Sequence, residues 1–230
     1  MNRFTYMSGN PDLKPETIHD LTLSGSYKWL QFMISYQREK DAILYITEQY
    51  KKNPAITTVT HRNFNRIDNF SAFLTASPAV GSWHPQLTVG VQKQWAKIEH
   101  NGETLQMDTP LFFCTLNNGI QLPYHWTLST DINFQSKGDY QNIYMYQNVF
   151  MMNATLTKSF LNEHLSIHLQ GIDLTHGRKD GNRIYNKHMN MDVANVSDSR
   201  ELRFTIRYKF NTAKSKYKGK GAATEEIKRL

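Results

Sequence analysis

The sequence predicts an all-β chain: an antiparallel, up-and-down transmembrane β-barrel segment of about nine strands, followed by a disordered basic tail. Three observations support this class. Apolar and polar side chains alternate with a period of two along most of the chain, as in strands with one apolar face. The seven prolines fall in loops or at strand ends, so none removes a ladder hydrogen bond from a strand interior. Short and long connections alternate, as they do in membrane barrels.

The first predicted strand begins at Thr17 and ends near Trp29, and the last occupies Arg200 to Asn211. The predicted strands have about 10 to 15 residues, whereas strands of soluble sandwiches usually have about 5 or 6. The least regular segments are 30–50 and 70–78. In chain order, the apolar faces are Leu21, Leu23, Gly25, Tyr27 and Trp29; Leu87, Val89 and Val91; Trp126, Leu128, Thr130, Ile132 and Phe134; Phe150, Met152, Ala154 and Leu156; Leu165, Ile167 and Leu169; and Leu202, Phe204, Ile206, Tyr208 and Phe210.

The connections between these strands are of two kinds. Tight turns are expected on the periplasmic side and long loops on the outer side. The expected short turns are at 29–30, 78–83, 123–125 and 161–163, and the expected long polar loops are at 50–65, 99–108, 136–144 and 175–200.

Alternation alone does not separate a membrane barrel from a soluble β-sandwich, but the aromatic residues favour the barrel. Trp83 and Trp95 share one face and are twelve positions apart, a rise of roughly 30 Å at ~3.3 Å per residue and ~40° tilt. Aromatic rings favour the headgroup layer. Lys93 and Lys158 lie on the apolar faces, and we expect them near strand ends, where their amines reach water. The aromatics expected at the short turns are Trp29, Trp83, Tyr124, Trp126, Phe160 and Phe210.

Composition excludes some classes of protein. Mean hydropathy is −0.60, and no apolar run reaches the ~18 residues that a spanning helix needs. The net charge of +7 is concentrated in the tail, and the body has no basic stripe interleaved with aromatics, so we expect no nucleic-acid binding. Cys114 is the only cysteine, which excludes an internal disulfide, and we expect it to pack among apolar neighbours.

The N-terminal residues Met1 to Met7 lack the apolar core and cleavage site of a signal peptide. We therefore expect either a cytosolic protein or a fragment whose export signal lies upstream. An odd number of strands favours the fragment, because an isolated bacterial barrel has an even number and no open edge.

The segment Gly9-Asn10-Pro11-Asp12-Leu13-Lys14-Pro15-Glu16 resembles the GNPxLKPE motif of TonB-dependent outer-membrane receptors, in which it ends an outer loop and leads into a descending strand. The final strand, with Tyr208-Lys209-Phe210, is similar to the aromatic-ended strand that barrel-assembly machinery recognises. The basic tail resembles the Bacteroidota-type branch of these proteins.

The resemblance implies the last nine strands of a 22-stranded barrel. It divides the chain into an outer loop (1–16), a partial barrel (17–211) and a periplasmic basic tail (212–230). It also implies partners: outer-membrane lipid, the missing N-terminal strands and plug domain, TonB through that plug, the barrel-assembly machinery, and an unknown small solute, peptide or glycan. The localisation implied is the bacterial outer membrane.

Candidate catalytic and metal sites are weak. His164 and His168 have the spacing of half a zinc helix motif, but they lie on a predicted strand. Glu39, Asp41 and Glu48 are carboxylates of a rim or loop, without further support for acid–base chemistry. There is no nucleophile elbow, phosphate loop or dinucleotide fingerprint. We expect no enzyme, and no catalytic, cofactor or metal residue.

Binding is the more plausible activity. The loop Lys137 to Gln147 mixes tyrosines and amides, which suits a polar ligand, and the loop Arg178 to Arg183 carries cations suited to an anion. No ligand-binding residue follows from the sequence. The expected function is the C-terminal wall of a TonB-dependent receptor that takes up a scarce solute and is not transport-competent alone. Two alternatives stay open: a self-contained small outer-membrane barrel, structural or adhesive, favoured by a tenth strand near 185–193, and a soluble β-sandwich binding module.

Overall fold

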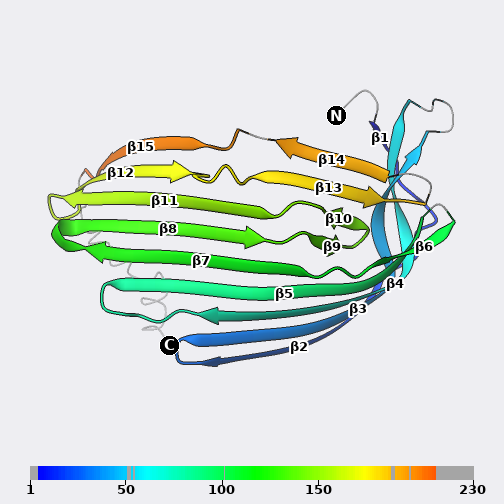
Figure 1. Cartoon of the computed structure of the whole chain (residues 1–230), viewed down its shortest axis with the longest axis horizontal. Coiled ribbons are helices and arrows are strands. Elements are labelled where there is room, and N and C mark those ends of the chain that lie inside the picture. The colour runs from blue at the N-terminus through cyan, green and yellow to red at the C-terminus, as the bar shows by residue number, and fades with distance from the viewer. Residues whose placement is uncertain are drawn as a thin grey trace, which may run out of the picture.

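The computed structural model describes residues 5–50, 53, 55–100, 102–187, 190–196 and 198–210. Apart from one short 3-10 turn, its regular elements are strands (Figure 1). The elements are β1 (Thr5–Met7), β2 (Thr17–Tyr27), β3 (Leu30–Gln49), β4 (Thr57–Ala76), β5 (Trp83–His100), β6 (Glu103–Met107), β7 (Leu111–Leu122), η1 (Pro123–His125), β8 (Trp126–Gln135), β9 (Gly138–Tyr140), β10 (Ile143–Met145), β11 (Val149–Phe160), β12 (Leu165–Ile172), β13 (Lys179–Tyr185), β14 (Asn190–Val196) and β15 (Glu201–Tyr208).

Nine strands form the wall of the molecule. They follow the order β2-β3-β4-β5-β7-β8-β11-β12-β15, and each is antiparallel to its neighbours. This meander confirms the predicted all-β, up-and-down class. Within the described residues β2 and β15 are edge strands of an open sheet, and they do not pair with each other. One pairing departs from the antiparallel pattern, because β1 lies parallel to β4.

The prediction of long irregular outer loops was wrong in part, because much of their length is strand. β3 and β4 each have 20 residues, well beyond the expected range, and β6 extends the main sheet. A second sheet has the order β14-β13-β10-β9. Residues 190–196 pair with β13 in this second sheet, so they do not add the tenth wall strand that a self-contained barrel would have.

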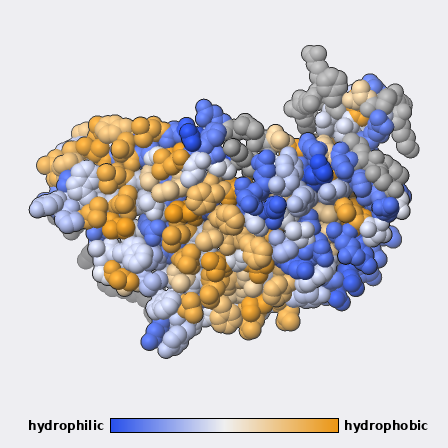
Figure 2. Space-filling model, in the orientation of Figure 1, coloured by the Kyte–Doolittle hydropathy of each residue, from blue (hydrophilic) through white to orange (hydrophobic). Residues whose placement is uncertain are grey.

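The wall exposes its apolar face. Leu23 on β2, Val89 on β5 and Phe204 on β15 are 61%, 40% and 62% exposed. Figure 2 shows apolar side chains spread over the wall, whereas hydrophilic ones gather at the end with the second sheet. A sandwich would bury this face against another sheet, so the soluble-sandwich alternative is wrong. No helix in the described ranges is long and apolar enough to span a bilayer.

The expected short turns are present at the opposite end, which we call the inner end. The turn before β12 places Leu161, Asn162 and Glu163 in the left-handed region (φ 52° to 67°). The predicted aromatics of this end are exposed, including Trp29 at 50% and Tyr124 at 83%. The expected final-strand boundary at Asn211 and the tail at 212–230 lie outside the described residues.

The two apolar-face lysines differ from each other in position. Lys158 lies near the inner end of β11, with its amine 5.2 Å from the ring centre of Trp126 and 5.4 Å from that of Phe160. Lys93 was expected near a strand end, but β5 continues to His100. The pairing of β5 with β7 stops at Gln92, however, so Lys93 stands where the outer extension begins.

At Asp41 the face of β3 that is buried changes. Its φ of 55° is left-handed, which twists the strand locally. Beyond it the buried apolar residues are Ala42, Leu44 and Ile46, which have the numbering parity of the exposed face below it. The main apolar core therefore lies in the outer extension of the sheet. It comprises Ala42, Leu44, Ile67, Ala96, Ile98 and Met107, with Phe64, Leu105, Tyr144 and Tyr185 packed against it.

Candidate functional site

The face of the wall opposite the apolar one is lined by hydroxyl and amide side chains, as the lumen of a barrel is. Thr22 donates to Asp20 (2.7 Å), and Ser35 on the next strand donates to the same carboxylate (3.1 Å). Thr115 donates to Asn133 (3.2 Å). These bonds, one within β2 and the others between neighbouring strands, satisfy polar groups on a face that presents donors and acceptors to a polar solute. Further inner-face pairs include Thr75 with Thr88, and His168 with Thr157 and Ser166.

The segment Gly9 to Glu16 is hydrogen-bonded to the outer halves of β3 and β4. The Asn63 side chain accepts from the main-chain N–H of Lys14 (2.8 Å) and donates to its carbonyl (2.9 Å). It also donates to the carbonyl of Asp41 (2.7 Å), and the Glu16 carboxylate accepts from the N–H of Ile43 (3.0 Å). The motif therefore supplies partners for main-chain groups around the Asp41 kink, and so fixes where β2 begins.

Buried amide side chains join the second sheet to the outer extension of the wall. Asn142, 1% exposed, donates to the carbonyls of Tyr45 (2.9 Å) and Tyr185 (3.1 Å). Gln94, 2% exposed, donates to the carbonyl of Gln141 (2.8 Å) and accepts from its N–H (2.6 Å). Such two-point contacts extend strand-like pairing between segments far apart in sequence.

A third amide completes this junction. Asn186 accepts from the N–H of Thr47 (2.8 Å) and donates to its hydroxyl, although 139 residues separate the two. The carbonyl of Asn186 also lies 2.5 Å from His100 Nδ1. The outer connections thus form a packed unit over the end of the wall.

Two carboxylates of the second sheet have shifted pKa values. Burial raises the pKa of Asp139 above its ordinary value and outweighs the hydrogen bond from the Thr109 N–H (2.8 Å). The Arg183 guanidinium donates two hydrogen bonds to Asp192 (2.7 and 3.0 Å), which lowers the pKa of that exposed carboxyl. Both pKa shifts have local structural causes, and neither carboxyl forms an acid–base pair of the kind that catalysis uses.

The two histidines considered for metal binding have separate partners. His168 bonds Thr157 through Nδ1 (3.0 Å) and Ser166 through Nε2 (2.9 Å), whereas His164 Nδ1 lies 3.4 Å from the carbonyl of Lys209. In the part of the chain that the structure describes, no three His, Cys, Asp or Glu side chains come together as a metal site would require.

Of the three carboxylates considered for acid–base chemistry, Glu39 and Glu48 have separate side-chain partners. Glu39 accepts from Asn69 (3.0 Å), and Glu48 accepts from Arg62 (2.6 Å). Asp41 lies at the kink of β3. Glu39 and Glu48 therefore have local structural roles, and Asp41 acts through its backbone conformation.

The two loops considered for ligand binding fold into the second sheet. Residues 137–147 form the β9–β10 hairpin, where Tyr144 packs on the apolar core and Tyr140 is 40% exposed. Of residues 178–183, all but Arg178 belong to β13, where Arg183 is paired with Asp192. Part of each loop therefore serves internal packing, and ligand binding at the exposed remainder stays a prediction.

Sequence reasoning missed the amides Gln94, Asn142 and Asn186. Their partners are 47, 97 and 139 residues away, so no local spacing identifies them. Cys114 lies among apolar neighbours, as expected: it is partly exposed on the apolar face, opposite Val89 and Phe134.

Comparisons with known proteins agree with this geometry. The fold is similar to the crystal structure of the outer membrane transporter YddB from Escherichia coli, with a TM-score of 0.52 and 12% sequence identity. The similar region covers 90% of this chain and 34% of that chain, so this chain spans about a third of that transporter. No curated protein matches. The outer membrane protein beta-barrel family matches residues 1–208. The chain belongs to this family, and its place is the bacterial outer membrane.

Proposed function

We propose that this chain is the C-terminal wall of a TonB-dependent outer-membrane transporter that takes up a scarce solute, rather than an enzyme. The observation that carries the proposal is the open nine-strand wall, apolar outside and polar inside, that begins at the GNPDLKPE segment. Exposed strand edges attract further strands, and closure of a barrel removes them. β2 and β15 are such edges, so the wall requires further strands, of which a 22-stranded barrel would supply thirteen.

The remaining partners would be the barrel-assembly machinery, a plug domain and TonB. β15 carries the aromatic end that barrel-assembly machinery would engage, and a plug inside the completed barrel would contact the polar face and reach TonB. The similarity to an outer membrane transporter over about a third of its length supports a part of a larger barrel.

The test is uptake by cells that lack residues 17–210 of this chain, compared with cells that carry them. A panel of labelled ferric siderophore, vitamin B12, oligosaccharide and peptide serves as probe. We expect uptake of one class to disappear in the deletion, and to stop in intact cells when a protonophore collapses the proton gradient that TonB uses. Uptake that survives the protonophore would contradict the TonB assignment.

A separate measurement tests whether the wall is incomplete. The chain alone, refolded in lipid vesicles, should give no closed barrel, and so no heat-modifiable band on a gel and no conductance. A stable conducting barrel formed by the chain alone would favour the small self-contained barrel instead.

A further inference from the structure

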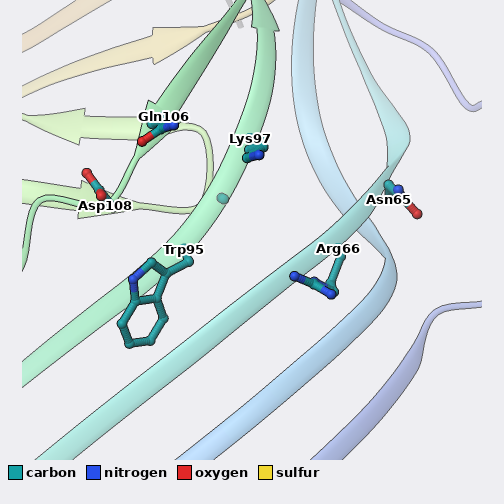
Figure 3. Close-up of a pocket in the computed structure, with 7 residues that line it drawn as sticks. Asn65, Arg66, Trp95, Lys97, Gln106 and Asp108 are labelled. Atoms are coloured by element: carbon teal, nitrogen blue, oxygen red, sulfur yellow. The ribbon is translucent and has the colours of Figure 1, made fainter.

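The outward face of the wall carries a cationic pocket at its outer end, on β4, β5 and β6. It has a volume of about 270 Å³ (Figure 3). Arg66 comes from β4, Trp95 and Lys97 from β5, and Gln106 from β6. The other lining residues are Asn65, Ala96 and Asp108.

Strand register arranges this region in successive rows across β3, β4 and β5. The lowest row is Tyr36, Phe70 and Lys93, which pair across the three strands. The next row is Arg38, Asp68 and Trp95. Above it Lys40 pairs directly with Arg66, and Lys97 is the next residue on the same face of β5 after Trp95.

The charges of these rows do not balance. Five cations (Arg38, Lys40, Arg66, Lys93 and Lys97) share this region with two carboxylates, Asp68 and Asp108. Asp68 is already shared between Arg38 (2.7 Å) and Arg66 (2.8 Å). Glu99, farther out on β5, is paired with Lys187 (3.1 Å). Among the described residues, no carboxylate lies within ion-pair distance of Lys40 or Lys97. Like charges placed directly opposite on neighbouring strands, as Lys40 and Arg66 are, destabilise a sheet.

The height of the rows corresponds to the outer headgroup layer. The ten steps from Leu30, at the inner turn, to Lys40 rise roughly 25 Å at ~3.3 Å per residue and ~40° tilt, the height of the apolar band. Just below, Trp95 (45% exposed) and Phe112 (52%) form the outer aromatic belt, which continues into the lipid-facing surface. A ligand of the cations would therefore have its apolar part beside the same wall.

We propose that this pocket binds the phosphate of a phosphorylated glycolipid from the outer leaflet of the outer membrane. Arg66 and Lys97, which line the pocket, and Lys40, which pairs with Arg66 at its edge, bind the phosphate oxygens. Gln106 donates to the sugar, and Trp95 packs on the sugar and the start of the acyl chains. Arg and Lys side chains bind phosphate through charge-assisted hydrogen bonds, and clusters of them beside a membrane surface bind the charged headgroups of lipids. A protein partner would not account for the continuity of the pocket with the acyl-facing surface.

Binding is measured by native mass spectrometry of the full protein in detergent, titrated with bisphosphorylated lipid A, with the same lipid after removal of its phosphates, and with inorganic phosphate. We expect the bisphosphorylated lipid to bind. The K40Q/K97Q variant should bind it about thirtyfold more weakly, because each basic residue near such a surface contributes about 1 kcal/mol. The K40R/K97R variant should retain binding.

The matched control is Lys158→Gln, an outward-facing lysine beside aromatic rings at the inner end. This variant should bind the lipid as the unmodified protein does. Equal binding of the dephosphorylated lipid, or an equal loss in Lys158→Gln, would overturn the proposal. Inorganic phosphate that displaces the lipid at similar concentration would also overturn it, because the site would then be a bare anion site.

A second measurement separates lipid binding from a folding defect. The K40Q/K97Q variant should be at least as heat-stable as the unmodified protein without lipid, because repulsion within the row is relieved. It should lose the rise in Tm that the lipid gives to the unmodified protein. If the variant is less stable without lipid and gains as much from the lipid, the proposal fails. This inference depends on the outward orientation of the wall and not on TonB coupling.

Discussion

At the scale of single residues, the outer loops depend on positions where space or main-chain partners are limited. Gly177 follows the kinked residues Asp173 and His176, and its N–H donates to the Asp173 carboxylate (2.8 Å). A Cβ on Gly177 would overlap the main-chain carbonyl of Phe150. A main-chain atom of a wall strand cannot move aside as a flexible side chain can.

Gly177→Ala should therefore lower the free energy of unfolding by about 1 to 3 kcal/mol, the usual cost of overpacking. Thermal unfolding of the protein in outer-membrane vesicles measures it. The control is Gly119→Ala on β7, where the nearest atom to an added Cβ is the His84 carbonyl oxygen at 3.9 Å. That variant should stay within about 0.5 kcal/mol of the unmodified protein or gain slightly, since alanine costs less backbone entropy. Equal losses at both positions would show that the Phe150 contact has no special role.

At the scale of elements, the amide junction decides how the second sheet is held. Asn142→Ala removes the donor from the carbonyls of Tyr45 and Tyr185, at about 1 to 3 kcal/mol for each buried group left without a partner. Hydrogen-exchange mass spectrometry should show faster exchange in β10 and β13 and unchanged exchange in β7 and β8. Gln121→Ala, at an exposed amide of β7, should leave both regions unchanged. Uniform acceleration in the wall strands would mean that the junction is not a separate unit.

The β13–β14 hairpin should depend on pH through Asp192, whose folded-state pKa is lowered by Arg183. A carboxyl whose pKa is lower in the folded state stabilises that state above its unfolded pKa, about 3.9. The contribution is lost as the pH falls through the folded pKa. We expect exchange of β13 and β14, corrected for the intrinsic pH dependence of exchange, to accelerate below about pH 4. Asp192→Asn should remove this pH dependence, and an unchanged profile in that variant would contradict the assignment.

The elements also show what a sequence can predict of this fold. The wall strands follow from period-two alternation because each has one face in lipid, so β2 begins at Thr17, where the pattern begins. The outer extension of the wall does not follow, because the Asp41 kink exchanges the buried and exposed positions of β3. Contacts such as Thr47 with Asn186 are set by tertiary packing alone. The sequence does not predict the cationic pocket for a similar reason. Its residues are recognised as neighbours only when the register of three strands is known.

At the scale of the whole molecule, the two faces of the wall should respond differently to charge, and one pair of residues tests this closely. Met151 and Met152 are adjacent on β11, carry the same side chain and are both half-buried. Met152 pairs with Ile132 on the apolar face, and Met151 pairs with Asn133 on the polar face.

Met152→Lys should lower the free energy of unfolding in vesicles by about 2 kcal/mol, since a charge facing lipid costs about 2 to 4 kcal/mol at the midplane and less toward the interfaces. Met151→Lys keeps its amine in the watery lumen and should cost less than about 0.5 kcal/mol, as surface substitutions do. Urea unfolding followed by tryptophan fluorescence gives both values under one condition. Because the two positions share a strand, a depth and a side chain, their difference isolates the solvent each face meets. If Met151→Lys were the costlier change, the hydrophilic face would be the one in hydrocarbon, and a barrel wall of this orientation would be untenable.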